Sequence, residues 1–408
     1  MAYNRKQRLN DNIKAIETAF ILDREQRTPT ARERLLLERY CGFGGLKCIL
    51  NPARELADAV HWAKSDLELF APTVELHRLI RENSKNESEY KQLMDSLKQS
   101  VLTAFYTPSA VTEALTDVLK EHHIIPEKVL EPSAGIGAFV DSVLDNNPKA
   151  DIMAFEKDLL TGKILRHLHP EQKVRIEGFE KIEKPFNDYF DLAISNIPFG
   201  DVAVFDPSYT AMKGMRALVT RRIHNYFFVK ALDTVRDGGL VAFITSQGVL
   251  NAKNNSAARF MMLYHADLVS AIRLPNNLFT ENANTEVGSD IIILQKNTQK
   301  ESLRGDDNLL DTVYNDKNRI PTNTRLPFKR NSVRIIMVRN TSCKSSTISK
   351  SYFTKAEAKR SNPANVFSVL FVLIPITFTF FGRLIKTGIK NACVNTVNES
   401  VGFALAAE

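Results

Sequence analysis

The sequence predicts an α/β fold built on a largely parallel sheet, and three observations indicate it. Apolar strands alternate with amphipathic helices between residues 101 and 300, which is typical of a parallel sheet with helices on its faces. A glycine-rich turn, Gly135-Ile136-Gly137, directly follows one of these strands. Glu156 ends the next strand along the chain. This order is typical of ligand sites at the carboxyl edge of such sheets.

The expected elements follow from local periodicity and turn residues. Strands are expected at 128–131, 152–156, 192–196, 240–245, 269–273 and 291–295. Helices between them are expected at 108–121, 137–145 and 221–235. Gly238-Gly239 separates the last of these helices from the strand that follows, which is typical of a helix end.

The composition divides the chain into four parts. Residues 1–100 carry apolar side chains at helical spacing, which predicts a helical N-terminal region. Residues 101–300 form the predicted sheet domain, and residues 301–330 are polar and predict a linker. Residues 331–408 are first basic and then apolar, and we expect an irregular C-terminal tail there. Within the first part, the glycine-rich segment 42–46 is either a helix–helix turn or a functional loop.

The net charge of +7 lies entirely in the tail. Residues 331–408 hold 10 Lys and Arg against 3 Asp and Glu, so residues 1–330 are neutral, with 44 of each sign. The net charge therefore says little about a nucleic-acid groove in the sheet domain. The four cysteines form no Cys-x-x-Cys pair, and no apolar leader follows Met1. These features predict a cytoplasmic protein with neither a disulfide framework nor a metal site.

The apolar part of the tail, residues 364–382, is a stretch of 19 residues without charge. That length is near the minimum for a membrane span. The stretch also contains Asn365, Ser368, Pro375 and two threonines. We favour a disordered apolar tail, or translation in a shifted reading frame, over a membrane helix.

The glycine-rich turn predicts a site for a cationic cofactor that contains a ribose. Glycines there let the backbone approach a ligand closely. Glu156 lies 19 residues after Gly137, an offset that suits the hydroxyls of a ribose. Glu131, which precedes the turn, repels a pyrophosphate and attracts a cation. S-adenosylmethionine (SAM) carries a ribose, an ammonium and a sulfonium, so it fits better than NAD; the alternative is a plain α/β turn.

Two further segments are expected beside this cofactor. Thr107 is placed to cap a helix that begins at Pro108 and to close over the methionine end, although a plain capped helix is the alternative. Phe179 is expected against the adenine, with Glu180 accepting from its amine, although a core Phe with a surface Glu is the alternative. The expected cofactor residues are Tyr106, Thr107, Pro108, Glu131, Pro132, Ser133, Ala134, Gly135, Gly137, Phe139, Glu156, Phe179 and Glu180.

The run Asn196-Ile197-Pro198-Phe199-Gly200 follows an apolar strand and predicts a site for a planar amino group. The N6 amine of adenine is a poor nucleophile because its lone pair is delocalised into the ring. Two acceptors, the Asn196 side-chain oxygen and the Ile197 carbonyl, are expected to pull the amine toward tetrahedral geometry. Pro198 restricts the backbone, and Phe199 is expected to stack on an extruded base. The alternative is an ordinary Asn-x-Pro turn.

In their order along the chain, these elements resemble the N6-adenine DNA methyltransferases whose cofactor half precedes the catalytic half. More specifically, the segments 42–46, 223–228, 239–245, 271–276 and 285–290 resemble the methylase portion of very large helicase–methylase proteins. Those proteins are carried by phages and conjugative elements of bacteria. The resemblance implies a Rossmann-like SAM-dependent methyltransferase sheet.

Carried over to this chain, the resemblance implies a role for individual residues. Thr107, Glu131, Gly135, Gly137 and Glu156 are implied to hold the cofactor, and Asn196, Pro198 and Phe199 the target base. Ile197 stands where the family usually has Pro or Val, a mild departure because only the carbonyl is used. The sequence contains no recognisable helicase and no recognisable target-recognition domain.

The sequence therefore predicts SAM-dependent methyl transfer to adenine N6 in DNA, without a metal ion. Two alternatives stay open. The acceptor is RNA or a glutamine amide of a protein, or the chain is an inactive or truncated remnant that binds SAM or nucleic acid without turnover. A helicase region outside this chain is a further expected partner.

Overall fold

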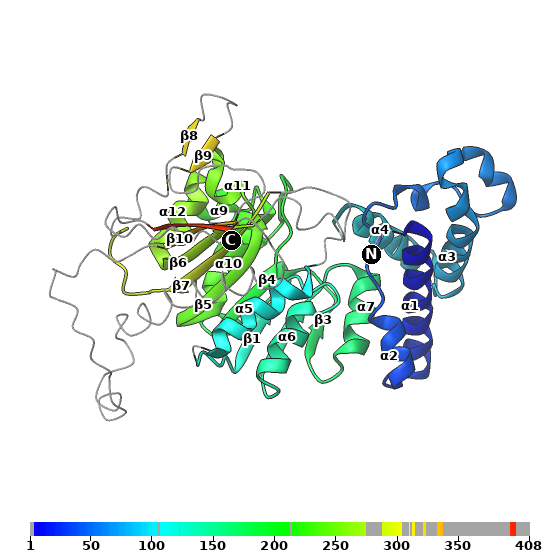
Figure 1. The fold of residues 1–408 in the computed structure, drawn as a ribbon, viewed down its shortest axis with the longest axis horizontal. Helices are drawn as coiled ribbons and strands as arrows, with labels where there is room; N and C mark the ends of the chain where they lie inside the picture. Colours follow the sequence, from blue (N-terminus) through cyan, green and yellow to red (C-terminus); the bar gives the residue numbers. More distant parts are fainter. Residues whose placement is uncertain are drawn as a thin grey trace, which may run out of the picture.

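A nine-stranded sheet runs through the molecule in the order β11-β10-β6-β7-β5-β4-β1-β2-β3 (Figure 1). The structure is a computed structural model. It describes residues 4–103, 107–121, 123–212, 214–274, 288–303 and 310, and the short stretches 312–314, 321–323, 333–337 and 392–396.

Seven strands form the main part of the sheet. They are β1 (Lys128–Glu131), β2 (Asp151–Phe155), β3 (Lys173–Arg175), β4 (Phe190–Asn196), β5 (Val235–Ser246), β6 (Ala266–Arg273) and β7 (Ser289–Lys296). The first five pair with one another in parallel, whereas β7 is antiparallel to both β5 and β6. The strand order 3-2-1-4-5 is that of a doubly wound sheet. All six strands expected from the sequence are confirmed, with ends that move by up to five residues.

Helices cover both faces of this sheet. The longer ones are α5 (Ser109–Glu121), α6 (Ala138–Asn146), α7 (Leu159–Leu168), α10 (Ile223–Thr234) and α12 (Ser256–His265). Val129 of β1 belongs to the core that includes α5 and α6, whereas Leu130 belongs to the core that includes α10 and α12. Successive side chains of a strand point to opposite faces. A central strand such as β1 therefore needs apolar residues at both positions.

Shorter elements complete the domain. They are α8 (Pro207–Thr210), α9 (Met215–Val219), α11 (Gly248–Asn251) and the 3-10 helices η4 (Phe179–Lys181), η5 (Lys184–Phe186) and η6 (Lys253–Asn255). The short strands β8 (Thr312–Tyr314) and β9 (Pro321–Asn323) form a separate pair.

The N-terminal region is helical, as the sequence predicted. It contains α1 (Arg5–Glu25), α2 (Ala31–Leu37), α3 (Phe70–Glu82) and α4 (Glu87–Thr103), with η1 (Lys47–Leu50), η2 (Leu56–His61) and η3 (Lys64–Leu69). Figure 1 shows these helices beside α7, at the opposite end of the molecule from β6. They share one hydrophobic core with Leu160, Ile164 and Leu168 of α7. The N-terminal helices are therefore packed directly onto the sheet domain.

The glycine-rich segment 42–46 lies inside this helical region. Asn12 of α1 donates from Nδ2 to the Gly42 carbonyl at 2.7 Å and accepts at Oδ1 from the Cys41 N–H at 2.9 Å. The Phe43 ring is fully buried. These contacts favour the helix–helix turn over a functional loop.

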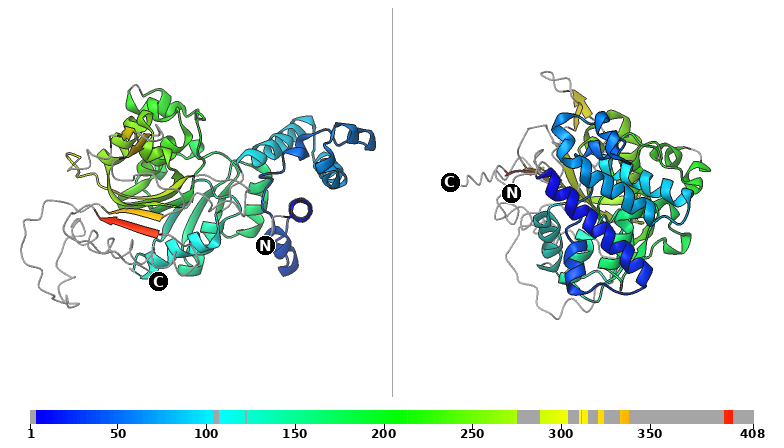
Figure 2. Two further views of the ribbon diagram at one scale, coloured as in Figure 1. Left: turned by 45° about the horizontal axis from the view of Figure 1, so that its top comes forward. Right: turned by 90° about the vertical axis from the view of Figure 1, so that its right-hand side faces the viewer.

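Two strands lie in the tail, where an irregular segment was expected. β10 (Val333–Met337) is antiparallel to β6, and β11 (Ala392–Thr396) is parallel to β10. They continue the sheet beyond β6 (Figure 2). The apolar stretch 364–382 lies outside the described residues. Across the part of the chain that the structure describes, no helix combines the length and apolarity needed to cross a membrane.

A buried ion pair joins the end of β6 to the start of β7. Arg273 donates to both carboxylate oxygens of Asp290, at 2.7 and 3.0 Å. The two side chains are 2% and 0% exposed. Arg273 and Asp290 belong to 271–276 and 285–290, two of the segments on which the methylase resemblance rests. We expect it to be a strong structural requirement, since an unpaired buried charge is costly.

Removing one partner of this pair tests that requirement. We expect Asp290→Ala to lower the free energy of unfolding by about 3–5 kcal/mol, because it removes the carboxylate that pairs with the buried Arg273 guanidinium. Asp188→Ala is the control: Asp188 pairs with Lys296 at 2.6 Å but is 65% exposed, and its loss should cost less than about 1 kcal/mol. Urea denaturation measures both. Equal losses would contradict the expectation.

Candidate active site

The glycine loop, Glu131 and Glu156 lie where β1 and β2 end, beside the end of β4. β1 lies between β2 and β4, so the loop that leaves it is flanked by both. Gly135 and Gly137 turn this loop with φ of +58° and +94°. A Cβ at Gly137 would lie 2.4 Å from Nε2 of His169, which follows α7. Only glycine allows both this conformation and this close approach.

A half-buried carboxylate ties the glycine loop to the end of β2. Glu156 Oε2 accepts from the Gly135 N–H at 2.8 Å, and Oε1 accepts from the Asp158 N–H at 2.7 Å. Burial and the Asp158 carboxylate raise the pKa of Glu156 to about 8, and these backbone N–H groups oppose the shift. Each oxygen keeps a lone pair for a further donor. The carboxylate is therefore placed to accept from ligand hydroxyls beside the loop.

Glu131 is the second carboxylate of this edge, and it is buried. It is 2% exposed, and its Oε2 has no hydrogen-bond partner within the described ranges. Burial, then the Asp141 and Glu156 carboxylates, hold its pKa well above the usual range. A buried polar atom without a partner is costly unless a ligand completes it. A hydrogen-bond donor of a ligand, neutral or cationic, fits this atom.

The N-terminal helices reach this site through one serine. Ser96 of α4 donates from Oγ to Asp158 Oδ2 at 2.7 Å and accepts from the Leu160 N–H at 3.0 Å. Asp158 in turn caps α7 by accepting from the Thr161 N–H. Asp158, whose N–H donates to Glu156, is therefore held in place by a residue of the N-terminal region.

The remaining residues of the loop are placed around this centre. Pro132 and Ala134 are buried, and Ser133 is half-buried. Phe139 of α6 is 1% exposed and packs in the core rather than at the surface.

The segment before α5 is only partly described. Thr107 and Pro108 are half-buried, and α5 begins at Ser109, one residue later than expected. The Val111 N–H donates to the Pro108 carbonyl at 2.9 Å, which closes the first turn. Tyr106 lies outside the described residues.

Phe179 packs as a core residue. Its ring is 1% exposed and lies 5.8 Å from the ring of Phe155 and 5.3 Å from that of Phe227. This environment favours the core alternative over an adenine contact. Glu180 is 17% exposed and pairs with Lys157 at 3.6 Å, which places it beside the residue that follows Glu156.

The Asn196 run leaves β4 at the same edge. The Ile197 N–H donates to the Ile244 carbonyl of β5 at 3.0 Å, and the Ile197 side chain is 1% exposed. Pro198 and Phe199 are half-buried. One residue before the run, the Ser195 hydroxyl donates to the Ser133 carbonyl at 3.2 Å. This bond places the Asn196 run directly beside the glycine loop, as the two motifs require.

The far end of the run is held by α10. The Gly200 N–H donates to Nδ1 of His224 at 3.4 Å. Burial, with Arg222 nearby, lowers the pKa of His224 to about 4, so the ring is neutral and accepts. Arg222 also pairs with Asp201 at 2.5 Å. His224 lies in the segment 223–228, one of those on which the methylase resemblance rests.

Asn255 joins α10 to the turn after β5. Its Oδ1 accepts from Arg222 Nη1 at 3.0 Å and from Asn225 Nδ2 at 2.9 Å, and its Nδ2 donates to the Gly248 carbonyl at 2.7 Å. Sequence reasoning missed Asn255, because its partners are 7 to 33 residues away in the chain.

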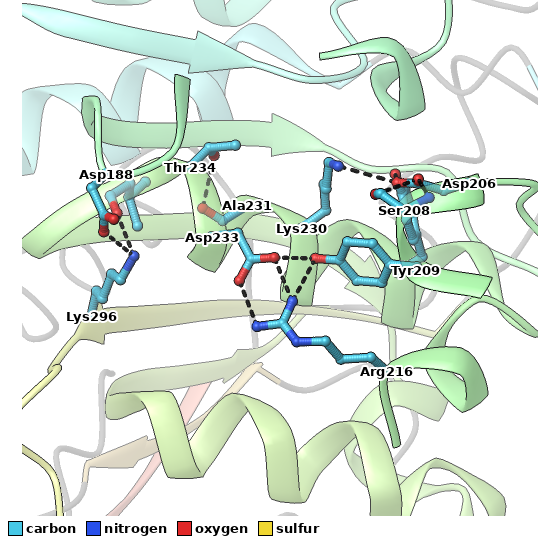
Figure 3. Close-up of polar contacts among 12 residues, drawn as sticks. Asp188, Asp206, Ser208, Tyr209, Arg216, Lys230, Ala231, Asp233, Thr234 and Lys296 are labelled. Atoms are coloured by element: carbon cyan, nitrogen blue, oxygen red, sulfur yellow. Dashed lines mark hydrogen bonds and ion pairs between the residues drawn. The ribbon is translucent and has the colours of Figure 1, made fainter. Parts of the chain in front are cut away.

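Two aspartates anchor the segment between the Asn196 run and α10 (Figure 3). Asp206 accepts from Lys230 Nζ at 3.1 Å and from the Tyr226 hydroxyl at 2.6 Å. Although burial opposes the shift, hydrogen bonds from Ser208, Tyr226 and Lys230 hold the pKa of Asp206 below its usual value.

Asp233 forms the second anchor. It accepts two hydrogen bonds from Arg216, at 2.6 and 3.0 Å, and one from the Tyr209 hydroxyl. The Asp206 contacts join the start of α8 to α10. The Asp233 contacts join α8 and α9 to α10. The backbone that leaves the run is thus fixed to a helix of the sheet domain. Nowhere in the described ranges do three or more His, Cys, Asp or Glu side chains gather as metal ligands.

A family model described as N-6 DNA Methylase matches residues 88–352. Defense against restriction protein B of Escherichia phage P1 is 29% identical over 201 residues, which cover 48% of this chain and 8% of that protein. Type II methyltransferase M.XamI of Xanthomonas campestris pv. amaranthicola is 24% identical over 173 residues, covering 39% of this chain and 33% of that one. The chain thus spans at most a third of either relative.

Solved structures share only a loose likeness. A methyltransferase subunit of a type I restriction-modification system from Streptococcus thermophilus is 12% identical, with a TM-score of 0.38 over 72% of this chain and 80% of that chain. The M protein of the type I restriction enzyme EcoKI is 15% identical, with a TM-score of 0.37 over 73% and 64%.

The family match and the sheet order confirm two predictions from the sequence, namely the resemblance to N6-adenine DNA methyltransferases and a Rossmann-like methyltransferase sheet. Because the family model covers more than half of the chain, this chain belongs to the N-6 DNA Methylase family.

Proposed function

We propose that this chain transfers a methyl group from SAM to N6 of adenine in DNA. Membership of the N-6 DNA Methylase family supports methyl transfer to DNA. The choice of SAM as donor and adenine N6 as acceptor rests on the Ser195–Ser133 hydrogen bond, because it sets the proposed amine site beside the proposed cofactor loop. The chain spans a small part of its relatives, so the activity of any longer protein is also part of the proposal.

Three groups are proposed to hold the cofactor. Glu131 binds its ammonium through the buried Oε2, and Glu156 accepts from the ribose hydroxyls. The Gly135-to-Gly137 backbone lets the cofactor approach β1 closely. When bound, SAM supplies an electrophilic methyl group on its sulfonium. Thr107 and Pro108 lie before α5 as expected for a segment that closes this site, and Glu180 stays the proposed partner of the adenine amine.

The Asn196 run is proposed to hold the target base. The Asn196 side-chain oxygen and the Ile197 carbonyl accept from the N6 amine, which exposes its lone pair. Phe199, half-buried at the edge of the sheet, stacks on the extruded base. Pro198 limits the backbone between them. No catalytic base is required, since the amine becomes acidic once it is methylated.

We also propose that the chain divides into four parts. Residues 1–100 form the helical region, 101–300 the methyltransferase domain, 301–330 the linker and 331–408 the tail. The Ser96–Asp158 contact gives the first of these regions a supporting role in the cofactor site.

Asn196→Ala tests the base site. We expect methylation of duplex DNA to fall by about 100-fold or more, because one acceptor that acts in the transition state is lost, while the affinity for SAM stays unchanged. Radiolabelled methyl transfer and calorimetry measure the two quantities. Asn187→Ala, at an exposed asparagine, is the matched control and should behave as the wild type. An active Asn196→Ala variant would remove the proposed catalytic role.

The same assay separates the candidate acceptors. Duplex DNA, RNA and protein are offered in parallel with labelled SAM, and we expect label in DNA alone. Label in RNA or protein instead would overturn the DNA assignment. No label in any acceptor, with SAM still bound, would identify the chain as a non-catalytic remnant.

Glu156 provides a pH test. Its folded-state pKa of about 8 lies above its ordinary value of 4.5, so the folded protein binds this proton more tightly than the unfolded chain. The free energy of unfolding should therefore fall as pH rises from about 4.5 to 8, by at most about 1.4 kcal/mol per pH unit from this group. Glu156→Gln should flatten that slope in thermal melts without SAM. The exposed control Glu82→Gln should leave it unchanged, and an unaltered slope in Glu156→Gln would contradict the assignment.

A further inference from the structure

A cavity of about 470 Å³ opens next to the Asn196 run. Its volume is in the range of pockets that hold a nucleotide-sized ligand. The polar side chains that line it are Asp201, Arg221, Arg222, Asn225 and Asn254, and apolar side chains from α9 and α12 close the rest. Asp201 directly follows Gly200, the last residue of the run. The cavity therefore borders the residue that directly follows the proposed base site in the sequence.

Two helix N termini converge on this cavity. Asn225 in the first turn of α10 and Ala257 and Ala258 in the first turn of α12 are among its lining residues. Neither first turn contains an acidic residue, and in both helices no side chain of the described residues caps the N terminus. Uncapped N–H groups and the helix dipoles favour an anion there.

The charges around the cavity add to this preference. Arg222 is paired with Asp201, so those two charges offset each other. Arg221 is exposed and forms no ion pair within the described ranges. One guanidinium is thus left to meet an anion, and a planar guanidinium matches a phosphate in geometry.

A buried amide supplies the second kind of contact. Asn225 is 4% exposed, and its Oδ1 has no hydrogen-bond partner among the residues that the structure describes. Its Nδ2 donates to Asn255 Oδ1, and Asn255 is oriented by its own bond to Gly248. This chain of bonds turns the Asn225 oxygen, an acceptor, away from Asn255. A ligand with both an anionic group and an N–H or O–H donor pairs with the Arg221 guanidinium and with the Asn225 oxygen, and a nucleotide has both.

We propose that this cavity binds a nucleotide of DNA that flanks the target base, with its phosphodiester at Arg221 and the N termini of α10 and α12. The Asn225 oxygen accepts from a donor on the same nucleotide. The inference rests on the proposed function for the identity of the polymer, whereas the anion preference stands on the cavity itself. The contact fixes the strand next to the run and leaves the reacting atoms to Asn196 and Ile197.

The test measures binding to a fluorescent DNA duplex by anisotropy across a range of salt concentrations, without SAM. We expect Arg221→Ala to weaken binding about five- to tenfold and to reduce the slope of log K against log salt by about 0.9, the value for one lost phosphate contact. Arg221→Lys should keep the slope. Arg32→Ala, at an exposed arginine of α2, is the matched control and should change neither quantity.

The outcomes separate this inference from the proposed function. If Arg221→Ala matches Arg32→Ala in affinity and slope while the wild type methylates DNA, the cavity assignment fails and the function stands. If the wild type binds DNA with the expected Arg221 dependence but methylates nothing, the cavity assignment stands. A wild type that binds no DNA, or an Arg221-dependent site for free dAMP with no effect on DNA affinity, overturns the assignment.

Discussion

The hydrogen bond from the Gly135 N–H to the Glu156 carboxylate organises the site at the edge of the sheet. It joins the loop after β1 to the end of β2, and the Ser195–Ser133 bond joins the same loop to the end of β4. Three neighbouring strands are thereby fixed at one point. The glycines make this possible, because a side chain at Gly137 would collide with His169.

The opposite side of the site depends on contacts that are distant in sequence. His224, Asn255 and Asp206 each connect the run or the segment after it to α10 or to the turn after β5. A site on such braced backbone is held more closely than one on a free loop. Among the buried polar atoms that have no partner within the described residues are Glu131 Oε2 and Asn225 Oδ1, and these are the two at which we propose ligand contacts.

The sequence predicted the fold well where the signal is local. β1 has the expected bounds, because an apolar run between Pro126 and the glycine turn has only one place to start and end. β5 begins five residues earlier than expected, because the charges and glycines around Arg236 hide its first residues. The antiparallel direction of β7 had no signal, since its apolar run reads the same in either direction. Phe179 was ambiguous because core packing and ligand contact select the same aromatic residue.

The shared core of α7 and the N-terminal helices has a consequence for where the chain can be divided. A fragment folds on its own only if it carries its own packing partners. Here Leu160, Ile164 and Leu168 of the sheet domain are buried by helices that precede residue 104. A break point between the two parts exposes that surface in both products. The folding unit is therefore the helical region together with the sheet, and not the motif-bearing sheet alone.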